Sequence, residues 1–371
     1  MSASKVKPDN PNQPDSIAVD SPPRDRMRFL GCAFQLLTIA MVLAAVASVA
    51  YFFYHEQPIV DEEDKIDNSV VIVESPNQSD DPESDPDEDV PPCSITSTIT
   101  REQIDAAEHP LDPLIEMAYH AVDVIETNVQ DYTATIVKRV RADGKLHGEQ
   151  HMFIKIRHGA GCDDDDVATQ IETPEPTTTD DGSATKEGAV PFSVYTRFVK
   201  PKSLRGQEAI WVQGNNDDKL IAHTTGILNV ISFHLDPEGP VAMRGNRYSI
   251  CNIGMVNLVK QMIAKGEHER QYKECEVHIH RNVMVGDARC TRIEIVHPEP
   301  RDYFDFHIAK IYFDDDRNLP IAYESYTWPE KEGGRPRLLE RYYYSNIQTN
   351  VGLTDADFDP SNDQYDYPNK S

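Results

Sequence analysis

Basic residues are scarce in this chain, and their scarcity excludes one large class of partner. The 371 residues include 36 Lys and Arg against 63 Asp and Glu, which gives a formal net charge of −27. Proteins that bind DNA or RNA hold the phosphates mainly with Lys and Arg, so nucleic acid is not an expected partner. Apolar residues are also few, at 39% of the chain. Globular domains usually contain about 45–50%, so part of this chain is not expected to pack into a core.

Cysteines and catalytic motifs are equally sparse. Five of the six Cys follow residue 55, and this odd number without tight spacing predicts no disulfide framework, although one disulfide within the folded part stays open. The sequence contains no Gly-x-Ser-x-Gly, no phosphate-binding Gly-rich loop and no His-Glu-x-x-His. These absences favour a binding domain without catalysis, metal or cofactor.

One long apolar run predicts a membrane anchor. Residues 29–54 contain no charged residue and no His, and a helix of this length spans a hydrocarbon core of about 30 Å. Arg24, Arg26 and Arg28 precede the run, so the tail over 1–28 is expected in the cytoplasm and the main domain outside. The prediction is a single-pass protein of the cytoplasmic (inner) membrane with an extracytoplasmic or periplasmic domain. Cleavage after Ala50, as in a signal peptide, is the alternative.

The excess negative charge is concentrated in two segments. Residues 56–92 contain fourteen acidic residues and one Lys, and residues 163–190 contain nine acidic residues and one Lys. Such segments bury too little apolar surface to offset the entropy of ordering. They predict a disordered acidic tether over 55–104 and a disordered insertion over about 158–190. The four Asp at 163–166 lack the Gly turn and closing Glu of a calcium loop, so a solvated charge run is favoured there.

The remaining chain predicts an α+β fold. Apolar residues recur at intervals of three and four residues over 111–129 and 254–265. This spacing indicates two helices, the second ending at Gly266. A hairpin is expected over 132–156, with a turn near Gly144. Further strands are expected at 192–199, 208–213, 219–223, 275–280, 290–297, 304–313, 321–327 and 338–344. Without a βαβ rhythm, these strands predict an antiparallel meander covered by the two helices.

Several segments resemble a known family. They are 191–195 (PFSVY), 206–214 (GQEAIWVQG), 245–248 (GNRY), 319–321 (LPI) and 350–360 (NVGLTDADFDP). Together with the order of elements, they resemble an uncharacterised family of bacterial envelope proteins in the LolA-like superfamily of lipoprotein carriers. The resemblance covers residues 105–367 and implies a curved antiparallel sheet, an unclosed barrel covered by two helices. It implies no activity.

Apolar side chains are the candidate ligand-binding residues. Aromatic and Met side chains suit adaptable contacts with acyl chains, and eight residues could line a pocket between sheet and helices. They are Phe192, Tyr195, Phe198, Trp211, Ile227, Leu228, Met255 and Met262. The competing interpretation is that they form a packed core.

Three functions follow from these patterns. The first is a membrane-anchored extracytoplasmic domain that binds a hydrophobic ligand, namely a lipid, an acyl chain or a lipoprotein. The second is a protein-interaction or sensor module with a solid core. The third is a metal-dependent hydrolase that uses the residues shared by two neighbouring strands, Cys275, His278, His280, Glu294 and His297. Polar residues on an exposed strand face explain the same pattern, and the oligomeric state stays open.

Overall fold

The structure is a computed structural model in which two compact units are distinguished, residues 1–55 and 56–371. The described residues are 72–73, 94–142, 144–159, 190–226, 229–331 and 333–368. The first unit, with the predicted tail and transmembrane helix, lies outside them. No helix in the described part of the chain has the length and apolar content needed to cross a bilayer.

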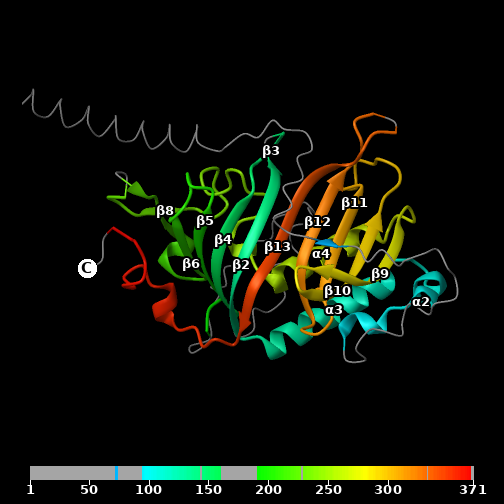
Figure 1. Ribbon diagram of the computed structural model, residues 1–371, viewed down its shortest axis with the longest axis horizontal. Helices are drawn as coiled ribbons and strands as arrows, with labels where there is room; N and C mark the ends of the chain where they lie inside the picture. Colours follow the sequence, from blue (N-terminus) through cyan, green and yellow to red (C-terminus); the bar gives the residue numbers. More distant parts are fainter. Residues whose placement is uncertain are drawn as a thin grey trace, which may run out of the picture. The chain divides into compact units, whose positions relative to one another are not determined.

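One antiparallel sheet of 13 strands forms the frame of the second unit (Figure 1). Its strands run in the order β1-β9-β10-β11-β12-β13-β2-β4-β5-β6-β7-β8, and the short β3 pairs with β2. Their bounds are β1 (Ile72–Val73), β2 (Asp131–Ala142), β3 (Lys145–Leu146), β4 (Gln150–Arg157), β5 (Ser193–Lys200), β6 (Glu208–Val212), β7 (Leu220–His223), β8 (Phe233–Leu235), β9 (Glu276–Val285), β10 (Ala288–Val296), β11 (Ile308–Asp314), β12 (Leu319–Thr327) and β13 (Arg337–Thr349).

The sheet agrees with the predicted α+β class. Within the described residues, the edge strands β1 and β8 do not pair with each other, so the sheet is unclosed. Every predicted strand is present, although the one expected from residue 304 begins only at Ile308. The short strands β1, β3 and β8 were not predicted, because two or three residues carry too little periodicity to be recognised.

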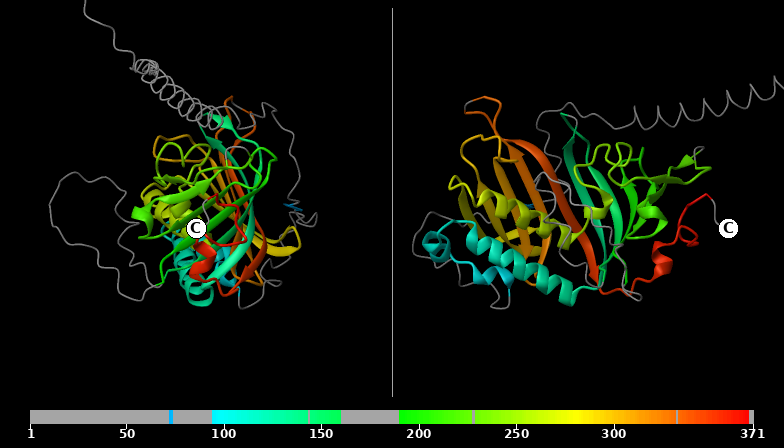
Figure 2. Two further views of the ribbon diagram at one scale, coloured as in Figure 1. Left: turned by 90° about the vertical axis from the view of Figure 1, so that its left-hand side faces the viewer. Right: turned by 180° about the vertical axis from the view of Figure 1, so that it is seen from behind.

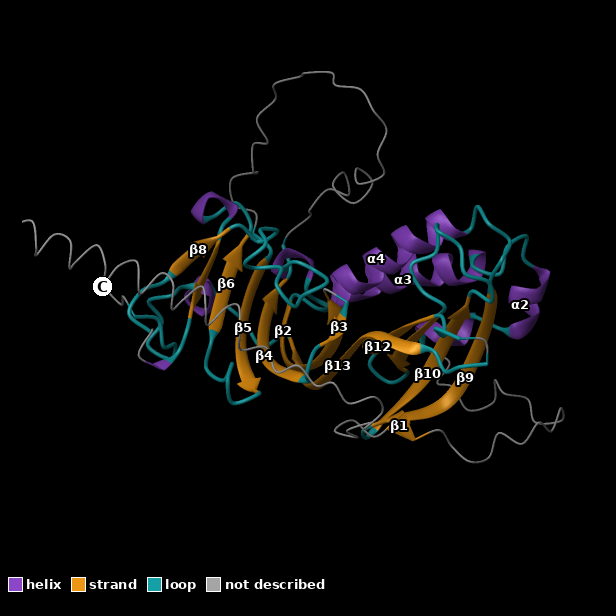
Figure 3. Cartoon of the chain, turned by 90° about the horizontal axis from the view of Figure 1, so that it is seen from above, coloured by secondary structure: helices purple, strands orange, loops and turns teal. Residues whose placement is uncertain are grey.

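Two antiparallel helices cover one face of the sheet, which we call the inner face (Figure 3). They are α3 (Asp112–Asn128) and α4 (Met255–Glu269), and their positions confirm both predicted helices. The predicted end of the second helix at Gly266 is wrong, because α4 continues for three residues beyond it. Gly266 is instead a buried packing position, where an added Cβ would lie 3.1 Å from Ile115 Cγ1. The missing side chain allows α3 and α4 to approach closely.

The first ordered segment begins earlier than predicted. Residues 94–104 belong to the predicted tether, but they include the 3-10 helix η1 (Ile95–Thr98) and the start of α2 (Arg101–Ala106). Polar contacts with the sheet hold this segment. Thr96 Oγ1 donates to Asp315 Oδ1 at 2.8 Å, and the Arg281 guanidinium donates to the Ile99 carbonyl at 2.6 Å. These contacts join residues about 200 positions apart, so the local sequence does not reveal them.

The last residues of the chain form the C-terminal strap, which we define as residues 350–368. The strap lies beside β5 and β6 (Figures 1 and 2). It covers the face of the sheet opposite the helices, the outer face, and encloses a second apolar cluster with β5 and β6. This cluster consists of Tyr195, Ile210, Phe358, Tyr365 and Tyr367. The two sides of the sheet thus have separate cores.

Candidate functional site: an apolar cavity beneath the helix pair

A cavity of about 50 Å³ lies between the helix pair and the inner face of β10 and β11. Residues from all four elements line it, and every one of them is apolar. The lining consists of Leu111, Leu114, Ile115, Met117, Ala118, Val259, Met262, Ile263, Gly266, Ile293, Ile295, Ile311 and Phe313. Cavities lined only by apolar groups stay dry and accept apolar ligands, so this cavity is a candidate site for hydrocarbon.

The sequence periodicities explain how these side chains meet. Residues three and four apart on α3 and α4 share one helical face, which lies over the sheet. In the strands, alternate residues point to the same face, so Ile293 and Ile295 of β10 lie on the inner face beside Ile311 of β11. The register places Ile293 directly opposite Ile311. Side chains with the helical spacing and side chains with the strand spacing therefore line the same apolar space.

A buried polar pair, Glu269 and His297, follows directly after this lining. Glu269 lies one helical turn after Gly266, and His297 is the next inner-face residue after Ile295. Glu269 Oε2 lies 3.5 Å from His297 Nε2, and both side chains are buried. Burial raises the pKa of Glu269 to about 8 and lowers the pKa of His297 to about 4. Both groups are therefore largely uncharged near neutral pH.

Five of the predicted pocket residues belong to the inner core or pack against it, and one of the five lines the cavity. Met262 is part of the lining. Met255 is completely buried, and its backbone N–H donates to the Tyr132 hydroxyl at 3.0 Å. Trp211 packs edge-to-face against Phe192, with ring centroids 6.0 Å apart. These three residues fill space in the core and are not part of the cavity lining.

Phe198 and Tyr195 of β5 lie on opposite faces of the sheet. Phe198 is half-buried against the inner core. Tyr195 belongs to the outer cluster, where its ring stacks on Tyr365 of the strap with centroids 4.2 Å apart. A single pocket therefore cannot include both residues. The other two predicted pocket residues, Ile227 and Leu228, lie outside the described part of the chain.

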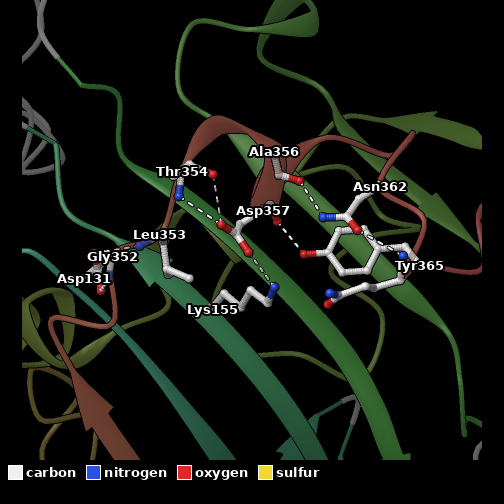
Figure 4. Close-up of polar contacts among 10 residues, drawn as sticks. Asp131, Lys155, Gly352, Leu353, Thr354, Ala356, Asp357, Asn362 and Tyr365 are labelled. Carbon is white, nitrogen blue, oxygen red and sulfur yellow. Dashed lines mark hydrogen bonds and ion pairs between the residues drawn. The ribbon is translucent and has the colours of Figure 1, made fainter.

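Polar anchors hold the strap in place (Figure 4). Asp131 accepts the backbone N–H groups of Gly352 and Leu353, at 3.2 and 2.9 Å. The Lys155 ammonium donates to Asp357 Oδ1 at 2.7 Å, and the Tyr365 hydroxyl donates to the Asp357 carbonyl at 2.6 Å. The 350–360 segment noted in the sequence thus contributes most of these anchors.

The family-like segment 245–248 has a similar anchoring role on the inner face. The buried Lys138 ammonium donates to Asn246 Oδ1. Arg247 Nε lies 3.2 Å from Glu340 Oε2, and the Tyr248 hydroxyl donates to Glu340 Oε1 at 3.1 Å. Glu340 is 1% exposed, so the loop that carries these residues fills the middle of the inner face with protein groups.

The residues proposed for a metal-dependent hydrolase do not converge. His278 lies opposite Glu294 in the β9–β10 register, on the outer face. His297 is buried on the inner face. Among the described residues, no three His, Cys, Asp or Glu side chains are grouped closely enough to hold a metal ion. Cys251, Cys275 and Cys290 are free thiols.

The Glu269–His297 pair beside the cavity lining does not follow from the predicted elements. The sequence pattern groups His297 with His278 and Glu294, whereas the structure pairs His297 with Glu269 on the inner face, because alternation along a strand does not show which face carries the helices. Glu269 lay beyond the predicted end of the second helix. If the second helix is continued through Gly266, the helical spacing places Glu269 on the apolar face of α4. This spacing is the signal in the sequence that indicates a buried acid.

Comparisons with solved structures give weak likenesses. A DUF1329 family protein from Desulfovibrio piger matches with 14% identity and a TM-score of 0.30. An outer membrane lipoprotein-sorting protein domain from Vibrio parahaemolyticus matches with 10% identity and 0.29, and a LolA superfamily protein from Nitrosomonas europaea with 10% and 0.25. Each alignment covers 66% of this chain and 97% of the other. Because the TM-scores are below 0.5, these likenesses carry no functional argument.

Comparison of the sequence with known families identifies the family of the chain. No curated protein matches the chain. A family described as "Protein of unknown function (DUF1571)" matches residues 129–367, which is more than half of the chain and most of the region in which the sequence resembles an uncharacterised envelope family. The predicted resemblance to an uncharacterised family is thus confirmed. The chain belongs to the DUF1571 family.

Proposed function

We propose that this domain binds the apolar part of a ligand, such as the acyl chain of a lipid or lipoprotein, in the cavity beneath α3 and α4. Binding takes place without catalysis. The apolar run at 29–54 supports a single-pass anchor in the cytoplasmic membrane, with the domain on its extracytoplasmic side. The tether would then keep the binding domain close to the membrane surface from which such ligands come.

The observation that carries the proposal is the wholly apolar lining of the space between the helix pair and the sheet. Each methylene moved from water into such a space contributes about 0.8 kcal/mol. The space is small, since 50 Å³ holds about four water-sized groups. A short stretch of chain fits directly, whereas a longer chain requires the helix pair to move away from β10 and β11.

A cavity-filling substitution tests the proposal. Ala118 lines the cavity from α3, and Ala118→Leu adds three carbons to the space. Ala264 is exposed on α4, so Ala264→Leu is a matched control outside the cavity. The full chain in lipid nanodiscs is equilibrated with 1-decanol by dialysis, and bound ligand is counted by native mass spectrometry. We expect wild type and Ala264→Leu to bind, and Ala118→Leu to bind at least tenfold less. Absence of binding by wild type contradicts the proposal.

A second candidate function is a protein-interaction module, and one observation favours it. The middle of the inner face is filled by the Arg247–Glu340 pair and by the buried side chain of Met255, and Trp211 is buried nearer the β8 edge of the sheet. A mostly solid core would leave recognition to the surface. In the same experiment, wild type that takes up no decanol would favour this candidate.

A further inference from the structure

The Glu269–His297 pair is a hydrogen-bonding site that the protein itself leaves incomplete. His297 is fully buried, with its ring stacked on Phe304 at 3.8 Å between centroids. Its Nδ1 lies 3.1 Å from the Phe306 carbonyl oxygen, whereas its Nε2 has no hydrogen-bond partner among the described residues. Glu269 Oε2 lies near Nε2 at 3.5 Å, but the two atoms do not form a hydrogen bond. Buried polar atoms are rarely left without a partner, so this one requires an explanation.

The proton positions follow from the neighbours. A carbonyl oxygen can only accept, so the imidazole donates from Nδ1 to Phe306. In the neutral ring, Nε2 then presents a lone pair and requires a donor. The Glu269 carboxyl group is protonated at neutral pH, because burial raises its pKa to about 8. It can therefore both donate and accept.

The nearest charged groups satisfy each other. Lys265 Nζ lies 3.2 Å from Asp305 Oδ2 in an ion pair that is open to solvent. The Lys265 charge lowers the pKa of Glu269 and the Asp305 charge raises it, and both effects are smaller than that of burial. No cation is therefore left over for the Glu269–His297 pair. An anionic group placed beside these two residues would be buried without a counterion.

The pair also lies in the right place to meet a ligand. The cavity lining includes Gly266 on α4 and Ile295 on β10. The next side chains along these two elements on the same side are Glu269 and His297. Neither residue is part of the cavity lining itself, and both follow directly after the end that Gly266 and Ile295 line.

We propose that the Glu269–His297 pair selects ligands with an uncharged head group that donates a hydrogen bond, such as the hydroxyl of an alcohol or a glyceride. The head-group hydroxyl donates to His297 Nε2 and accepts from the Glu269 carboxyl group. An ether cannot donate, and a carboxylate is charged, so both leave a buried polar atom unsatisfied. This inference rests on the proposed function, because it assigns the polar end of the same cavity.

Three ligands of equal chain length provide the test. The probes are 1-decanol, its methyl ether 1-methoxydecane, and decanoate. The full chain in nanodiscs is dialysed at pH 7.4 against equal free concentrations of each, so that partition into the lipid does not bias the comparison. Binding is measured by native mass spectrometry on wild type, His297→Phe and His278→Phe. His278 lies on the outer face, so the last variant is the matched control.

We expect wild type and His278→Phe to bind decanol at least tenfold more tightly than either other probe, and His297→Phe to bind decanol and the ether within threefold. Equal binding of all three probes by wild type, or tighter binding of decanoate, overturns the head-group inference and leaves the proposed function standing. If no probe binds, the proposed function fails together with this inference. The comparison of the three probes on wild type needs no variant, so it tests the head-group inference even if His297→Phe does not fold.

Discussion

The ring of Tyr365 stacks on the ring of Tyr195, with centroids 4.2 Å apart and planes inclined by 13°. The two residues are 170 positions apart, and their contact joins the C-terminal strap to β5. Tyr365 also donates its hydroxyl to the Asp357 carbonyl within the strap (Figure 4). One side chain thus stabilises both the conformation of the strap and its attachment to the sheet.

Removing the Tyr365 ring is expected to destabilise the domain. Truncation of a buried aromatic side chain to Ala costs about 3–5 kcal/mol, and Tyr365 is buried, so we expect Tyr365→Ala to lower the free energy of unfolding by about 3 kcal/mol. Urea unfolding can be followed by the fluorescence of Trp211 and Trp328, the two Trp of the chain. Tyr119 is 54% exposed, and Tyr119→Ala is the control, with an expected change below about 0.5 kcal/mol. Equal effects of the two variants would contradict the role of the strap.

A side chain at position 266 is expected to force the helix pair apart. Because an added Cβ lies 3.1 Å from Ile115 Cγ1, Gly266→Val should lower the free energy of unfolding by about 2 kcal/mol, as overpacking of cores usually does. The same residue at the exposed neighbouring position, Ala264→Val, should cost about 0.5 kcal/mol through helix propensity alone. Urea unfolding measures both. A Gly266→Val domain as stable as wild type would show that the helices do not need this close contact.

The buried acid is expected to make stability depend on pH. The pKa of Glu269 is raised to about 8 in the folded state, so above the unfolded pKa near 4.5 the unfolded chain ionises while the folded domain does not. The Glu269 contribution to stability should therefore fall as pH rises from about 5 to 8, by up to about 1.4 kcal/mol per pH unit. Burial lowers the pKa of His297 to about 4, which has the opposite effect up to its unfolded pKa near 6.5, so the net fall is expected between about pH 6.5 and 8.

The Glu269→Gln variant removes this ionisation. The difference in free energy of unfolding between Glu269→Gln and wild type should therefore grow in favour of the variant as pH rises from 5 to 8. Urea unfolding at pH 5, 6, 7 and 8 measures the slopes. Glu267→Gln, two residues earlier on α4, is the control and should keep the wild-type slope. Identical slopes for wild type and Glu269→Gln would contradict the buried, neutral state of the acid.

Loss of Arg247 is expected to loosen the loop over the inner face. Arg247→Met leaves the buried Glu340 carboxylate without its cation, which costs about 3–5 kcal/mol for a fully buried pair. Arg247 itself is partly exposed, so we expect about 2 kcal/mol, together with faster tryptic cleavage after Arg244 in the same loop. The exposed Arg205 provides the control variant Arg205→Met, which should change neither property.

The local periodicities were sufficient to predict the frame of the domain. The apolar face of α3 follows the helical period, and the β2–β4 hairpin follows the strand period around its turn at Gly144. The end of α4 was missed, because Gly266 is required by contact with Ile115 and not by a turn. Gly at the end of a periodic run is a local signal for a helix end, and here a tertiary contact explains the residue instead.

The candidate site was predictable only in part. The apolar character of Met262 was visible, but the assignment of Tyr195 to the same pocket failed because the strap covers it from the other side. Alternation along a strand says that neighbouring side chains diverge, yet it does not say which face meets the helices. That information depends on residues 350–368, which return to the sheet from the far end of the sequence.

The acidic insertion leaves β4 and returns to β5 at residues that are already partners, since Arg157 lies opposite Ser193 in the ladder. The register is therefore set by the two strands themselves, whatever the length of chain that joins them. A reporter protein or an affinity tag spliced between 160 and 189 should leave both the cavity and the strap as they are. Insertions and deletions between β4 and β5 should therefore be tolerated without a change in the register of the sheet.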